Sequence, residues 1–100
     1  MTTHRDRYPI RVGALVWPQQ TDWAPLLETA RLADRTGLDS LWTWDHMHAI
    51  VGDPLQPIYE GWTTLAGWAA ATERNDLGLM VGANTFRNPA LTAKSAVTVD

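Results

Sequence analysis

The sequence predicts an α/β protein built on a parallel sheet, and three observations support this fold class. Three apolar runs recur along the 100 residues, and helical periodicity fills much of the chain between and after them. Roughly 30 residues separate the starts of the first two runs, as a right-handed strand–helix–strand crossover requires. Polar side chains follow the runs directly, as at the carboxyl ends of strands in such folds. Either a doubly wound sheet or a (β/α)8 barrel would continue this pattern.

The first strand is expected at residues 10–17, a nearly unbroken apolar run typical of a strand buried on both faces of a parallel sheet. Thr21 or Asp22 is the expected N-cap of the helix that follows, and its first turn tolerates Pro25. Gly37 supplies the left-handed residue that ends this helix. Helical spacing predicts an inner face that comprises Leu26, Ala30 and Ala33, with Leu27 beside it.

The later elements are a strand at 38–44, a loop at 45–61, a helix at 62–71 and a strand at 77–83. A loop of this length is uncommon unless it is functional or disordered. Asn88 followed by Pro89 then starts the last helix, with a cap residue and a proline in the first turn. That helix runs toward Asp100, where the pattern has no visible end.

Composition narrows the class of protein. A formal net charge of −3 gives no basic patch, so we expect no nucleic-acid partner. The absence of cysteine excludes disulfides and thiolate metal sites and fits a reducing compartment. Residues 1–9 form a polar leader that lacks the apolar stretch of a signal peptide, and no later run approaches membrane-spanning length. We therefore expect a cytoplasmic protein with no membrane partner.

Asp45 and His46 are the candidate catalytic residues, because the second apolar run ends in this adjacent acid and base. Histidine suits acid–base catalysis near neutral pH, and aspartate accepts hydrogen bonds from a ligand. Neighbouring residues on a strand point to opposite faces, but a turn at the strand end could bring both side chains to one pocket. A structural alternative stays open, in which Asp45 caps the following loop and His46 bonds to the backbone.

Other candidate residues lie at the predicted strand ends. Among the six tryptophans, Trp17 and Trp44 are placed to contact a flat ligand, although tryptophan more often bridges core and surface. His48 lies on the long loop, over the expected pocket. His46 and His48 have no third ligand at a plausible spacing, so we expect no metal site.

The exit of the third strand is the other candidate site. Gly82 allows close approach of the backbone to a ligand, and Asn84 supplies a short polar group. Arg87 could bind an anion, but a single arginine without evident partners favours a structural role. No GxGxxG pattern follows any strand, so the usual dinucleotide fingerprint is missing.

Taken together, these motifs resemble the N-terminal third of the luciferase-like monooxygenase family, especially its branch that uses the deazaflavin coenzyme F-420. Each motif alone is modest, but their order and spacing are specific. The matching stretches are residues 11–19, 37–42, 44–46, 71–74, 77–81, 86–94 and 98–100.

The resemblance implies the N-terminal part of a (β/α)8 TIM barrel of about 250 residues or more, with its active site at the C-terminal face. Residues 10–100 would then be the N-terminal third of the barrel domain, behind the leader at 1–9, and the chain would be truncated. Contacts to the coenzyme phosphates come largely from later strands in this family. We therefore expect the 100 residues alone to be inactive, and the full-length protein to be a possible homodimer.

The implied activity is hydride transfer between coenzyme F-420 and a small organic substrate. The alternatives are an FMN-dependent monooxygenase that uses O2 and a non-catalytic flavin-binding barrel. The resemblance makes His46 an acid–base group near the hydride-transfer centre, and it makes Asp45 a contact of the ring or its surroundings. It also implies a non-prolyl cis peptide bond at Met80–Val81, a bulge behind the ring. The expected cofactor contacts are Asp45, Met80, Val81, Gly82 and Asn84, and the expected substrate pocket is Trp44, His48 and Trp17.

Overall fold

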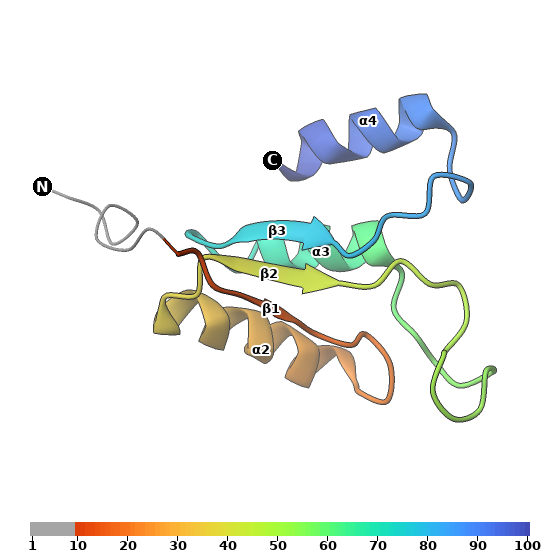
Figure 1. Cartoon of the computed structure of the whole chain (residues 1–100), viewed down its shortest axis with the longest axis horizontal. Coiled ribbons are helices and arrows are strands. Elements are labelled where there is room, and N and C mark those ends of the chain that lie inside the picture. Colours follow the sequence, from red (N-terminus) through yellow and green to blue (C-terminus); the bar gives the residue numbers. More distant parts are fainter. Residues whose placement is uncertain (1–9) are drawn as a thin grey trace, which may run out of the picture.

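Three parallel strands form one sheet in the order β1–β2–β3 in the computed structural model, which describes residues 10–100 (Figure 1). The elements are β1 (Gly13–Leu15), α2 (Trp23–Thr36), β2 (Ser40–Thr43), α3 (Gly61–Ala69), β3 (Asp76–Leu79) and α4 (Pro89–Val99). Leu41 pairs with Ala14 on one side and with Leu77 on the other. The predicted order of elements is confirmed. The expected leader at 1–9 lies outside the described residues.

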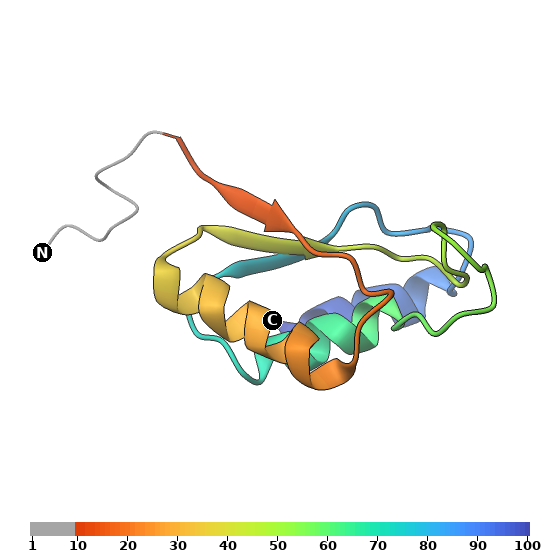
Figure 2. The same ribbon diagram turned by 90° about the horizontal axis from the view of Figure 1, so that it is seen from below.

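The helices lie on one side of the sheet, and the core forms between them and the strands (Figure 2). Full burial of each large apolar side chain contributes roughly 1.5–3 kcal/mol. The predicted inner face of the first helix is confirmed, because its residues are the ones that α2 buries. The buried cluster comprises Leu26, Ala30, Ala33, Leu41, Leu65 and Trp68.

The first strand differs from the sequence prediction in length and in burial. It spans only Gly13–Leu15, and the side chains of Leu15 and Trp17 are exposed by 43% and 49%. Ala14 and Val16, which alternate with them, pack against the helix-covered core. The prediction that residues 10–17 are buried on both faces is therefore wrong for this chain, because the helices cover only one face of the sheet.

The later strands also end earlier than predicted. β3 stops at Leu79, and Met80 makes the last strand-like hydrogen bond when its N–H donates to the Thr43 carbonyl at 2.8 Å. The next peptide bond, Met80–Val81, is cis, which confirms the expectation drawn from the family resemblance. Residues 80–83 therefore belong to the loop that leaves the sheet rather than to the strand.

Helix ends follow the sequence signals with one exception. Gly37 adopts φ 81° and ends α2, and the Asn88 side chain accepts from the Ala90 N–H at 2.9 Å at the start of α4, both as predicted. Asp22 occupies the N-cap position of α2, but its side chain makes no capping hydrogen bond. The Thr21 hydroxyl instead donates to the Asp22 carbonyl at 3.2 Å. No helix within residues 10–100 is both long and apolar enough to cross a membrane.

Candidate active site at the carboxyl ends of the strands

Side-chain alternation along β2 separates the two candidate catalytic residues. Leu41 points into the helix-covered core, and alternation places Asp45 on the same side of the chain. Asp45 indeed lies against the first residue of α3, because a Cβ added to Gly61 would come within 2.8 Å of Asp45 Oδ1. The His46 ring instead lies 5.5 Å from the Trp44 ring in a T-shaped contact. Asp45 thus pairs with Arg87 and His46 contacts Trp44, although His46 is near enough to contribute to the lowered pKa of Asp45.

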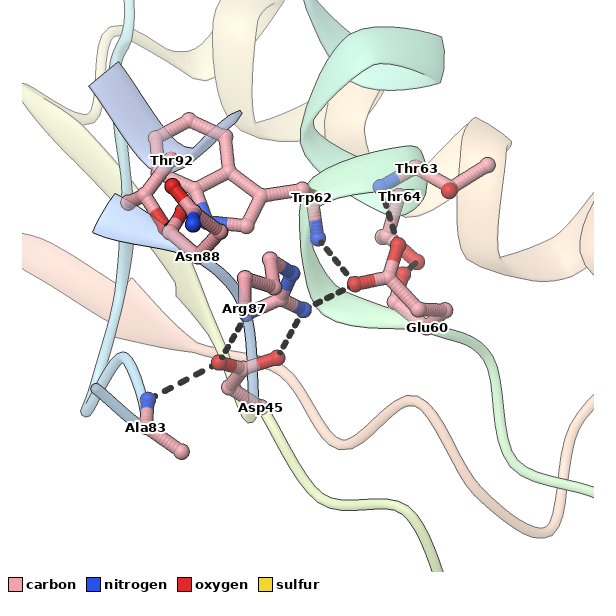
Figure 3. Close-up of polar contacts among 9 residues, drawn as sticks. All are labelled: Asp45, Glu60, Trp62, Thr63, Thr64, Ala83, Arg87, Asn88 and Thr92. Atoms are coloured by element: carbon pink, nitrogen blue, oxygen red, sulfur yellow. Dashed lines mark hydrogen bonds and ion pairs between the residues drawn. The ribbon is translucent and has the colours of Figure 1, made fainter. Parts of the chain in front are cut away.

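Asp45 is held by two parts of the loop that follows β3 (Figure 3). Arg87 Nη1 and Nη2 donate to Oδ2 and Oδ1 at 2.7 and 2.6 Å, and the Ala83 N–H donates to Oδ2 at 2.8 Å. The Asp45 side chain is only 2% exposed, and that of Arg87 is 12% exposed. A bidentate pair of this kind fixes orientation as well as distance. Asp45 is thus a buried acceptor with three hydrogen bonds from its own chain.

The charge state of Asp45 follows from these neighbours. Hydrogen bonds from Arg87 lower the pKa of the Asp45 carboxyl against the opposing effect of burial, and the Ala83 N–H lowers it further. Asp45 in turn raises the pKa of the Arg87 guanidinium. Asp45 is therefore ionised at neutral pH, a state that accepts hydrogen bonds but has no proton to donate.

Glu60 is the third charged residue of this cluster, and the sequence analysis did not single it out. Its carboxylate accepts from the Trp62 and Thr63 N–H groups at 3.2 and 2.7 Å, which caps α3, and it also pairs with Arg87 Nη2. Burial tends to raise the pKa of Glu60, but the hydrogen bonds from Thr63, Arg87 and Trp62 lower it overall. Glutamate is not among the favoured N-cap residues, so the local pattern gave no signal for this role. Arg87 bridges two carboxylates, so the partners that the sequence did not reveal are present in the structure.

Aromatic side chains gather on the opposite, open face of the sheet. Trp17 follows β1 and stacks on Trp44, with ring centroids 4.9 Å apart and planes inclined by 29°. Trp44 is 8% exposed, whereas half of the Trp17 surface stays accessible. The structure thus brings Trp17, Trp44 and His46 into one row. His48, which was expected to line the same pocket, is exposed on the long loop and takes part in none of these ring contacts.

The predicted cofactor contacts after β3 are accessible. Met80, Val81, Gly82 and Asn84 are exposed, while Ala83 between them is tied to Asp45. A Cβ added to Gly82 would meet only Leu79 atoms, at 3.7 Å or more, so open space lies beside this backbone. Within the described residues, no three histidine or carboxylate side chains converge on a point that could hold a metal ion.

Gln19 anchors the long loop, and sequence reasoning missed it. This residue is 3% exposed, and its side chain accepts from the Ile50 N–H at 2.8 Å and donates to the Val51 carbonyl at 3.1 Å. The neighbouring Pro18 carbonyl accepts from the Tyr59 N–H at 3.0 Å. Both halves of the loop are therefore hydrogen-bonded to the segment that follows β1. A lone glutamine carries no sequence signal for such a role.

A groove of about 690 Å³ runs along the edge of β3, between α3 and α4. Leu77 and Val99 line it, and residues 82–84 with Arg87 line one end, but Trp44 is not in its lining. The groove therefore lies beside the outer edge of β3 and apart from the Trp17–Trp44 stack.

The fold is a parallel α/β arrangement in which the candidate residues follow the carboxyl ends of the strands. The sequence model of the luciferase-like monooxygenase family matches residues 8–100. The chain belongs to this family. No match was found among curated proteins.

A solved structure supports the same assignment. The chain is similar to an F-420-dependent secondary alcohol dehydrogenase in complex with an F-420–acetone adduct, with a TM-score of 0.75 and 26% sequence identity. The match covers 85% of this chain and 26% of that one, so the chain spans about a quarter of the neighbour's length. The predicted fold class is confirmed: strands and helices alternate as at the start of a TIM barrel.

Proposed function

We propose that the full-length protein is an oxidoreductase that transfers hydride between coenzyme F-420 and a small organic substrate. Membership of the luciferase-like family and the likeness to an F-420-dependent secondary alcohol dehydrogenase support this proposal. The observation that carries it in this chain is the row of aromatic rings beside His46 at the end of β2. Flat rings next to an imidazole suit a ring-shaped redox carrier and a substrate that gains or loses a proton.

The residues at the ends of the strands fit such a carrier. Trp17 offers a half-exposed aromatic face, and residues 80–82, which follow β3 at the same carboxyl-terminal end of the sheet, are exposed. The side chains of Met80 and Val81 are uncharged and 47% and 76% exposed, which suits contact with an uncharged ring system. When bound, the coenzyme supplies the hydride donor or acceptor.

The chain's own residues have separate roles in this proposal. His46 is exposed at the end of β2, where its imidazole can hold or deliver the proton that accompanies reduction of a carbonyl group. Trp17 and Trp44 shield one side of the pocket from water. Asp45 stays ionised in its pair with Arg87 and takes no part in proton transfer.

The test compares the two candidate coenzymes in the full-length protein. We expect saturable binding of coenzyme F-420 and hydride transfer with small alcohols or ketones, read from the visible absorbance of the oxidised coenzyme. Oxygen consumption with reduced FMN and no reaction with coenzyme F-420 would contradict the proposal in favour of a monooxygenase. Coenzyme binding without turnover on any alcohol or ketone would indicate a non-catalytic binder.

A matched pair of variants tests the proton role. His46→Ala should lower kcat by roughly 100-fold or more while coenzyme binding stays within a few-fold, because general acid–base catalysis contributes about 10²–10⁴-fold. His48→Ala is the control, since His48 is exposed two residues away and makes no ring contact. Equal effects of the two substitutions would remove His46 from the mechanism.

A further inference from the structure

Arg87 joins three segments that lie far apart in the sequence. Its guanidinium contacts Asp45 after β2 and Glu60 at the start of α3, and Arg87 itself belongs to the loop that leads into α4 (Figure 3). The three side chains form one connected ion-pair cluster in which the arginine is almost fully buried. Lysine cannot reproduce this geometry, because it lacks the planar fork that binds two acceptors at once.

The cluster fastens the loop after β3 to β2 at successive points. The Met80 N–H donates to the Thr43 carbonyl at 2.8 Å, and the Ala83 N–H and the Arg87 side chain both donate to Asp45. Residues 80–87 therefore run alongside the end of β2 with an attachment at each end and one between. The exposed residues 80–82 are therefore held on one side of this strand end.

The same strand end carries the aromatic row. Trp44 and His46 are the immediate chain neighbours of Asp45 on either side. Any shift of the loop relative to Asp45 would thus change the distance between the 80–82 backbone and the His46 ring. Misplacement of a reacting group by about 1 Å can cost roughly 100-fold in rate, so this relative position matters for a bound substrate or coenzyme.

We infer that Arg87 is a positioning residue of the coenzyme site, and that Asp45 acts through Arg87 rather than by touching the coenzyme ring. This inference rests on the proposed function. Arg87, Asp45 and Glu60 fix the exposed backbone of residues 80–82 relative to Trp44 and His46. The family resemblance implied that Asp45 contacts the ring or its surroundings. We assign it an indirect role because its side chain is only 2% exposed and its carboxylate already accepts three hydrogen bonds from the chain.

A double-mutant cycle in the full-length protein tests the inference. Arg87→Gln and Asp45→Asn should each lower kcat at saturating coenzyme F-420 by up to roughly 100-fold, because residues 80–82 shift relative to His46, and each should also raise the Kd of the oxidised coenzyme several-fold. The double variant should bind no more weakly than Arg87→Gln alone, because the two residues act as one unit. Multiplied effects in the double variant would show that Asp45 and Arg87 act on coenzyme binding independently and would overturn the inference.

Two further variants keep the test decisive. Arg87→Lys keeps the charge but loses the fork, so it should fold and still raise the Kd several-fold; an unchanged Kd would reduce Arg87 to a purely structural residue. Arg35→Gln is the control, since Arg35 pairs with Glu28 on the exposed face of α2, and its Kd should not change.

Hydrogen exchange separates this inference from the proposed function. Arg87→Lys should speed amide exchange in residues 80–87 and leave α2 unchanged, with no ligand present. Unchanged exchange in 80–87 would overturn the inference even if coenzyme F-420 binds. Failure of the wild-type protein to bind coenzyme F-420 would refute the proposed function, and faster exchange in Arg87→Lys would then still establish that Arg87 holds the loop.

Discussion

Gly61 is the position where a single methyl group should disturb the candidate site most. A Cβ at Gly61 would lie 2.8 Å from Asp45 Oδ1, 2.9 Å from Leu79 Cδ2 and 3.1 Å from the Trp44 carbonyl oxygen. The first two contacts are closer than non-bonded atoms tolerate, so Asp45 or Leu79 must shift, and the third is tight enough that the Trp44 carbonyl must also give slightly. Two of these neighbours belong to backbone or to the buried ion pair and cannot easily give way.

The expected change in the free energy of unfolding is the difference between two effects. Overpacking of this kind costs about 1–3 kcal/mol. The two contacts under 3.0 Å place Gly61→Ala in the upper part of this range, at about 2–3 kcal/mol. Alanine gains back about 1 kcal/mol because it restricts the unfolded chain more than glycine does and favours the helix. Gly61→Ala should therefore lower the free energy of unfolding by about 1–2 kcal/mol. For a full-length barrel this corresponds to a fall in Tm of roughly 2–8 °C.

Thermal unfolding of the full-length Gly61→Ala variant measures this effect, and Gly82→Ala is its control. A Cβ at Gly82 would meet only Leu79 atoms, at 3.7 and 3.8 Å, which is ordinary contact. Gly82→Ala should therefore leave Tm within about 1 °C of wild type. If Gly61→Ala is as stable as wild type, Asp45 does not lie against the start of α3, and the geometry argued for the ion-pair cluster is wrong.

Three further predictions concern the Asp45–Arg87 ion pair, the long loop and the isolated 100-residue chain. The pKa of Asp45 is lowered in the folded state, so the ion pair's stabilisation is fully present above the unfolded value of about 3.9 and is lost as pH falls through the lower folded value. Below about pH 4, the free energy of unfolding should accordingly fall less steeply with decreasing pH in Asp45→Asn than in the wild type. An equal slope in the two proteins would contradict the pairing. Gln19→Ala removes two hydrogen bonds worth about 0.5–1.5 kcal/mol each, so it should raise substrate KM and speed amide exchange at residues 46–58 without changing coenzyme Kd. An equal rise in coenzyme Kd would show that the loop holds the coenzyme instead. The isolated 100-residue chain should show no saturable micromolar binding of coenzyme F-420 in a fluorescence titration; such binding would mean that later strands are not needed.

The backbone elements could be predicted where their signals are local. Gly37 at a helix end and Asn88–Pro89 at a helix start act within one turn of chain, so sequence alone locates them. The burial of residues 10–17 could not be judged in the same way. Apolar character shows that a strand can be buried, but Leu15 and Trp17 are covered only if another part of the fold packs against that face.

The candidate site was predicted only in part, because its contacts are long-range. Sequence reasoning found Asp45, His46, Trp17 and Trp44 from their place at strand ends. It could not show that Arg87, 42 residues beyond Asp45, lies between two carboxylates. The alternation of strand side chains was a usable signal that Asp45 and His46 have different main contacts, since Asp45 lies against Gly61 and His46 contacts the Trp44 ring.

The most direct test of the account is a crystal structure of the full-length protein with coenzyme F-420 bound. We expect the deazaflavin ring beside the backbone of residues 80–82 and near His46, with Asp45 still paired to Arg87. A ring bound at the amino-terminal ends of the strands, or far from His46, would contradict the account.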